Sequence, residues 1–142
     1  MVVSELFIRA DLVWRALALC VLLASVETLH GIWRTVWLVP RLGKARALRW
    51  SVVTGGALAT GVCALTVPGF GLQGLTAHLV LGLVLALFMA AFDVVLGLTL
   101  LRRPLARVLE DFDPRTGNLL AFGLVWLALV PALVWALGAC CA

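Results

Sequence analysis

The sequence predicts an all-helical, polytopic membrane protein in which four transmembrane helices form an antiparallel bundle, with a short interfacial helix in the second cytoplasmic loop. Of its 142 residues, 64% are hydrophobic, and the mean hydropathy is +1.15. Soluble domains contain about 45–50% apolar residues, and a chain of this length cannot bury the excess in its own core. Several apolar stretches also have the length that a bilayer-spanning helix needs, about 20 residues.

We expect one transmembrane domain over residues 1–142, with spans at about residues 12–38, 50–68, 75–101 and 118–138. Residues that disfavour helix continuation mark the ends of these spans. They are Pro40 after the first span, residues 68–71 (PGFG) after the second, residues 102–104 (RRP) after the third, and residues 116–118 (TGN) before the fourth. Pro131 lies within the fourth span, where we expect a kink.

Basic residues indicate how the spans are oriented. They gather in two links, with Arg34, Arg41, Lys44, Arg46 and Arg49 in the first and Arg102, Arg103, Arg107 and Arg115 in the second. The link between the second and third spans has no charge. The positive-inside rule places both basic links in the cytoplasm and both termini outside. We therefore expect a multi-pass membrane protein. Its net charge is +4, but its basic residues cluster between the apolar spans, which favours a lipid surface over a nucleic-acid partner.

The second basic link also has the pattern of a short amphipathic helix. Apolar residues recur at helical spacing, and charged residues lie on the other side: Leu105, Val108, Leu109 and Phe112 against Arg107, Glu110 and Asp111. This pattern predicts a short helix lying on the cytoplasmic leaflet.

Three ionisable residues interrupt the first apolar span. In the stretch SVETLHGIWR (residues 25–34), Glu27, His30 and Arg34 are spaced at i, i+3 and i+7, which places them on one face of a helix. A charged side chain at membrane depth costs about 2.5–3.5 kcal/mol even on insertion scales, so this face should point into the bundle.

The predicted topology brings further polar residues to the same depth. Glu27 lies about 15 residues into the first span and Asp93 about 18 residues into the third, so the two acids differ in depth by about 5 Å. Ser51, Thr54 and Asn118 fall in the same inner third of the bilayer. We therefore predict an intramembrane polar cluster of Glu27, His30, Arg34, Asp93, Ser51, Thr54 and Asn118.

Two interpretations of this cluster differ in function. Arg34 is expected to pair with Glu27 or Asp93, and His30 to hydrogen-bond the remaining acid. One negative charge is then left, which a protonated His30 or a bound proton would cancel. The cluster therefore either fixes helix packing without further activity or marks a proton or ion path.

No cofactor, metal site or catalytic residue is predicted. His78 begins the third span near the outer surface, about 18 Å from the depth of His30, so the two histidines cannot hold one haem iron. The cysteines have no zinc spacing. Cys20 and Cys63 are expected to fill apolar space, whereas the role of the adjacent Cys140 and Cys141 stays open.

Small residues in the second span predict close helix contacts. Gly55, Gly56, Ala59 and Thr60 belong to the stretch TGGALATG, which lets helices approach on more than one side. We expect this span to pack within the bundle and against another membrane subunit or a second copy of the chain.

The segments ETLHGIWRTVWLVPRLG, RWSVVTGG, FDVVLG and LEDFDPRTGNLL together resemble an uncharacterised family of small four-helix bacterial inner-membrane proteins. The recurring elements are E-x-x-H-G-x-x-R, P-R-x-G and a D-F-D segment. The resemblance implies the fold and the membrane location, and it implies no activity.

The sequence leaves three functions open. The first, which the sequence favours, is a small integral membrane interaction or accessory subunit, organised by the polar cluster. The second is a small oligomeric ion-coupled transporter or proton conduit. The third is a membrane redox protein or enzyme, which the absence of the common catalytic motifs disfavours.

Overall fold

The computed structural model describes residues 2–116 and 119–141, and among them it contains helices and no strands. In chain order the elements are α1 (Val2–Trp33), the π-helical η1 (Arg34–Leu38), α2 (Val39–Leu42), α3 (Lys44–Thr66), η2 (Val67–Phe70), α4 (Leu75–Thr99), α5 (Leu105–Glu110), η3 (Pro114–Thr116) and α6 (Leu120–Cys141). The expected all-helical class is confirmed.

Four segments are long and apolar enough to cross a membrane, as the sequence predicted. They are Arg9–Leu42, Lys44–Phe70, Leu75–Thr99 and Leu120–Cys140. The first boundary differs from the expected one. Pro40 does not end the helix, because the helical backbone continues through η1 and α2 to Leu42. The chain instead breaks at Gly43, whose φ of 77° is accessible to glycine.

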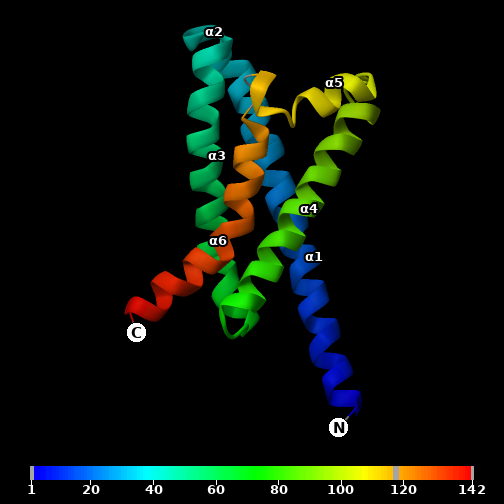
Figure 1. The fold of residues 1–142 in the computed structure, drawn as a ribbon, viewed down its shortest axis with the longest axis vertical. Coiled ribbons are helices and arrows are strands. Elements are labelled where there is room, and N and C mark those ends of the chain that lie inside the picture. The colour runs from blue at the N-terminus through cyan, green and yellow to red at the C-terminus, as the bar shows by residue number, and fades with distance from the viewer. Residues whose placement is uncertain (1, 117–118, 142) are drawn as a thin grey trace.

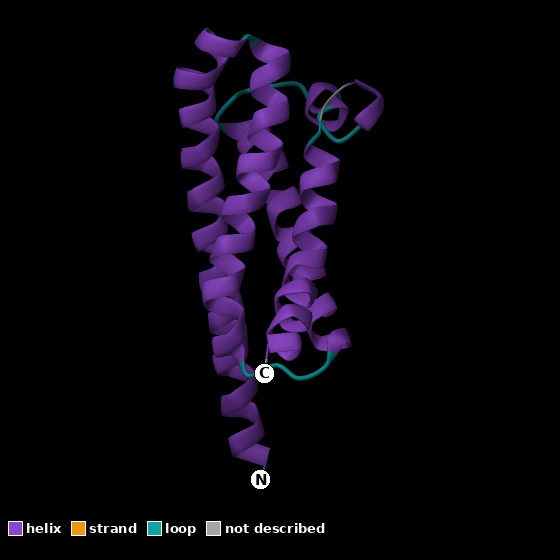
Figure 2. Cartoon of the chain, turned by 90° about the vertical axis from the view of Figure 1, so that its left-hand side faces the viewer, coloured by secondary structure: helices purple, strands orange, loops and turns teal. Residues whose placement is uncertain are grey.

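The four long helices lie side by side (Figure 2). In Figure 1, α2 and α5 occupy one end of the molecule, while η2 and the N-terminus lie at the other. Helix α6 packs most extensively against α4 and next against α3. It changes direction partway along (Figure 1), and Pro131 lies inside it, as expected of a proline that removes a helical hydrogen bond.

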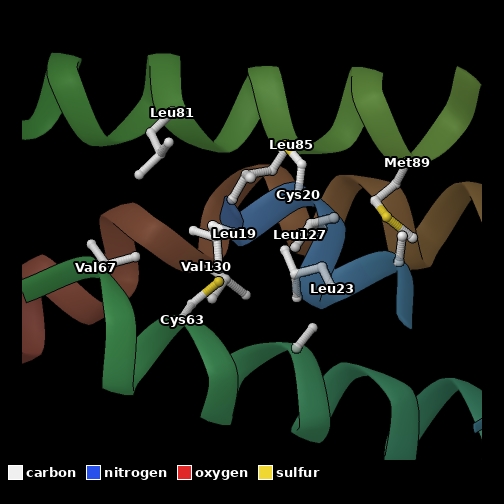
Figure 3. Close-up of a cluster of buried hydrophobic side chains, with 12 residues drawn as sticks. Leu19, Cys20, Leu23, Cys63, Val67, Leu81, Leu85, Met89, Leu127 and Val130 are labelled. Carbon is white, nitrogen blue, oxygen red and sulfur yellow. The ribbon is translucent and has the colours of Figure 1, made fainter. Parts of the chain in front are cut away.

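A hydrophobic core joins all four long helices below the level of the polar residues. Figure 3 shows Leu23 of α1, Cys63 of α3, Leu85 of α4 and Val130 of α6 pointing toward one another. Each of these four residues is at most 1% exposed, and the neighbouring Cys20 of α1 is 2% exposed. Cys20 and Cys63 thus behave as the apolar fillers that the sequence predicted.

The short helix α5 folds back onto the end of α4. Val108 is buried against Gly97, where an added Cβ would lie 3.0 Å from the Val108 Cγ2 atom. The Arg103 guanidinium lies 3.2 Å from the Asp111 carboxylate, and the Arg103 N–H donates to the Gly97 carbonyl. The helix occurs where the sequence predicts one, and its place at a membrane surface stays a prediction.

Candidate functional site: a polar cavity between four helices

A cavity of about 660 Å³ lies between α1, α3, α4 and α6. We call it the polar cavity, because it brings together most of the polar cluster. Its charged and polar lining residues are Glu27, Thr28, His30, Arg34, Thr35, Ser51, Asp93 and Arg103. The remaining lining is apolar or glycine, so charged groups face a mainly apolar space.

Helix α1 and the segment η1 that continues it supply three of these groups. Glu27, His30 and Arg34 all line the polar cavity, as their spacing on one helical face predicted. Arg34 begins the π-helical segment η1, in which the Val39 N–H bonds to the Arg34 carbonyl. Short π-helical segments within α-helices often occur at functional sites, and this one begins at the residue that carries the guanidinium.

His30 joins α1 to α3 through a hydrogen bond. Its Nε2 atom lies 2.8 Å from Thr54 Oγ1, and the ring is 8% exposed. The Thr54 hydroxyl donates to the Trp50 carbonyl at 2.9 Å. Because a hydroxyl has one proton to donate, Thr54 accepts from His30, which assigns the proton to Nε2.

The second ring nitrogen of His30 faces an acid. Nδ1 lies 3.8 Å from the Glu27 carboxylate oxygen Oε2. Since Nε2 already carries a proton, one further proton can reside on either partner, which gives a neutral histidine beside a protonated Glu27 or an ion pair. The Glu27–His30 pair therefore has the geometry of a proton-holding site on the wall of the polar cavity.

Arg34 is not joined to an acid in the described part of the chain. Its guanidinium donates to Ser51 Oγ at 3.4 Å, and no ion pair within 4.0 Å links it to Glu27 or Asp93. The expected Arg34 pairing is thus not formed among these residues. Arg34 still lies close enough to Glu27 for an electrostatic interaction.

Asp93 reaches the polar cavity from α4. It is half-buried and lines the cavity, and it forms no hydrogen bond or ion pair with the residues that the structure describes. The nearest charges that act on it include Asp111. Asn118, which was expected in the same layer, lies outside the described residues.

The small residues of α3 face other helices of the same chain. A Cβ on Gly55 would lie 3.3 Å from Glu27 Oε2, and one on Gly56 would lie 3.5 Å from the Trp126 ring. Trp126 Nε1 donates to Thr60 Oγ1 at 3.1 Å, and Ala59 is buried in the core. The close approach of helices is thus present inside the chain, whereas an additional subunit on this helix stays a prediction.

Among the lining residues that sequence reasoning missed are Phe92, Arg103 and Trp126. Arg103 was assigned to a link between spans, and periodicity along one helix does not reveal which side chains of other helices meet it. His78 lies apart from the cavity. Its Nδ1–H donates to the Gly74 carbonyl at 2.8 Å, and its ring stacks on Trp135.

A comparison with models of known protein families gives no match, and comparisons with curated proteins and with solved structures give none either. The resemblance to small four-helix inner-membrane proteins therefore stays a prediction, and the site is interpreted from its own geometry.

The His30–Thr54 bond gives a first test of the site. Thr54→Val should lower the free energy of unfolding by about 1 kcal/mol, because it removes a hydrogen bond to a buried ring. Thr66→Val is the matched control, since Thr66 donates to the Val62 carbonyl in the same way. Nitrogen-15 NMR of labelled histidine should show a protonated Nε2 in the wild type, and equal stability of the two variants would contradict the assignment.

Proposed function

We propose that the chain is a membrane protein whose four long helices cross the bilayer in alternating directions. The support is their length and composition, together with large apolar side chains on the outer surface, such as Trp14 and Leu65, which are 71% and 87% exposed. In a bilayer these side chains contact acyl chains and not water. The basic links favour the cytoplasm for α2 and α5, and a bacterial inner membrane fits the resemblance.

Within that membrane, we propose that the protein is a small proton-coupled carrier, in which the polar cavity binds the substrate. The observation that carries this proposal is the Glu27–His30 pair, whose atoms Oε2 and Nδ1 lie 3.8 Å apart on the wall of a 660 Å³ cavity. A purely structural network would pair its charges with one another across helices. Here Asp93 and Arg34 instead face the cavity without a mutual ion pair.

A chain of this size has little room for a complete transport path of its own, so we propose that it works as an oligomer.

The hydrophobic core closes the polar cavity on the side away from α5, because Leu23, Met89 and Leu127 belong both to the cavity lining and to the core. The cavity is thus closed on the side away from α5, and release on that side requires the helices to move.

The accessory-subunit function is the second candidate, and the cross-helix bonds favour it. His30–Thr54 and Trp126–Thr60 tie α1 and α6 to α3, as bonds that fix helix packing would. The two functions differ in what the acids do. In a carrier the acids exchange protons, whereas in an accessory subunit they serve the assembly.

Infrared difference spectroscopy of the reconstituted protein tests the carrier function without a known substrate. Acidification should produce the carbonyl stretch of a protonated carboxyl group, because Glu27 takes up a proton. This band should be absent from Glu27→Gln, while Glu110→Gln on the exposed side of α5 should retain it. A spectrum with no band that depends on Glu27 or Asp93 would overturn the proposal and favour the accessory subunit.

A further inference from the structure

We infer that the polar cavity binds a membrane-partitioning organic cation, with the charged group of the ligand between Glu27 and Asp93 and its apolar body against the aromatic and aliphatic walls. This inference rests on the proposed function and adds the chemical class of the substrate to it. Charge, wall chemistry and the position of the opening each support it.

The charges that line the polar cavity leave an excess of negative charge. Glu27 and Asp93 contribute two carboxylates, and Arg34 contributes one guanidinium. The other lining cation, Arg103, is paired with Asp111 at 3.2 Å. With His30 neutral, one negative charge is uncompensated in an apolar environment, where an isolated charge is costly. A proton or a cationic ligand removes that cost.

The walls favour an organic cation over a metal ion. The lining includes the rings of Phe92 and Trp126 and the side chains of Leu23 and Met89. Aromatic faces attract organic cations through their quadrupoles, and a cavity of about 660 Å³ lies in the range of about 300–1,000 Å³ that small-molecule sites occupy. A bare metal ion would use little of this volume and would need more oxygen ligands.

The opening of the polar cavity is lined by apolar side chains. Ile32 and Val36 of α1 and Leu100 and Leu101 of the α4 end line the cavity, and all four are more than half exposed, at 55%, 62%, 73% and 55%. In a bilayer these side chains meet lipid, so a ligand dissolved in the membrane reaches the cavity without crossing the positively charged loops. This geometry selects a cation that partitions into lipid.

Protons and the organic cation compete for the same acids. The ionisable groups that face the cavity are Glu27 and His30 from α1, Arg34 from η1, Asp93 from α4 and Arg103 beyond α4, with Asp111 acting on Asp93. Helix α3 contributes Ser51, and the described residues of α6 that line the cavity are uncharged. Binding of a cation should therefore displace a proton, and acidification should weaken binding.

The test measures binding of radiolabelled tetraphenylphosphonium to the full-length protein in detergent, with neutral triphenylphosphine oxide as competitor. We expect saturable binding, release of protons into a weakly buffered solution, and weaker binding at lower pH. Asp93→Asn should weaken binding at least about tenfold, which is about 1.4 kcal/mol. Asp93→Glu should retain most of it, and Glu110→Gln should bind as the wild type does.

Two results would overturn the inference. One is binding that survives both Asp93→Asn and Glu27→Gln, and the other is equal competition by the neutral compound, which would show apolar binding without charge recognition. If no saturable binding occurs while the Glu27-dependent infrared band is present, the proton-coupled function stands and the organic-cation substrate is wrong. If the band is also absent, both fail. Circular dichroism and gel filtration of each variant establish that it is folded.

Discussion

Gly82→Ala should destabilise the protein more than any other single methyl addition on its helices. A Cβ on Gly82 of α4 would overlap the carbonyl oxygen of Ala128 in α6 and lie 2.7 Å from its carbonyl carbon. Both atoms belong to the backbone, so a rotamer change cannot relieve the contact. The two helices with the most extensive contact in the bundle must separate, which we expect to cost about 3 kcal/mol, the upper end of the range for overpacking.

Gly61→Ala is the matched control for this prediction. Gly61 lies inside α3 with no heavy atom within 4 Å of an added Cβ, so alanine should stabilise the helix by up to about 1 kcal/mol through its higher propensity. The two variants carry the same chemical change and should shift the thermal unfolding midpoint in opposite directions, measured by circular dichroism in one detergent. Equal shifts would mean that α4 and α6 do not pack at Gly82.

Helical spacing predicted which residues would share a face and not which atoms would pair. Glu27, His30 and Arg34 lie together because an i, i+3, i+7 pattern fixes angular position on a single helix. The partners of these residues depend on how the helices pack, which is a property of the whole chain. The sequence thus led us to expect an acid as the hydrogen-bond partner of His30, whereas in the structure His30 Nε2 lies 2.8 Å from Thr54 Oγ1.

Counting residues from the end of each span predicted which residues lie at the same depth. A helix rises by a fixed 1.5 Å per residue, so equal distances from the end of a span indicate equal depth, and Asp93 accordingly lines the same cavity as Glu27. The cavity itself could not be predicted, because it depends on how the ends of the helices diverge. Trp126 enters its lining because it packs against Gly56 and Thr60 of α3, a contact between helices that the sequence does not reveal.

Pro40 shows that a residue that disfavours helices does not always mark the end of a helix. Proline disfavours helix continuation because it lacks an N–H and its ring meets the preceding turn. Here the π-helical segment η1 precedes Pro40 and the helix runs on without a break into α2, so the first spanning segment continues to Leu42. A sequence pattern does not reveal where a π-helical segment will precede a proline.

Gly55→Leu should abolish cation binding while leaving the chain helical. A Cβ at this position would already lie 3.3 Å from both Glu27 Oε2 and the His30 Cε1 atom, a tight contact that the His30 ring and the carboxylate can relieve only by moving. The remaining carbons of leucine would occupy the space in which Glu27 meets His30. We expect the His30–Thr54 bond to break and the affinity for tetraphenylphosphonium to fall at least about tenfold.

Gly61→Leu separates this effect from a general effect of adding a large side chain to α3. Gly61 lies on the same helix as Gly55, and a Cβ added there has no neighbour within 4 Å. Cation binding and the nitrogen-15 signal of His30 in Gly61→Leu should therefore match the wild type. If Gly55→Leu bound the cation normally while its His30 signal changed, the Glu27–His30 pair would not form part of the ligand site. The negative charge that recognises the cation would then belong to Asp93 alone, and proton exchange at Glu27 would act on binding only from a distance.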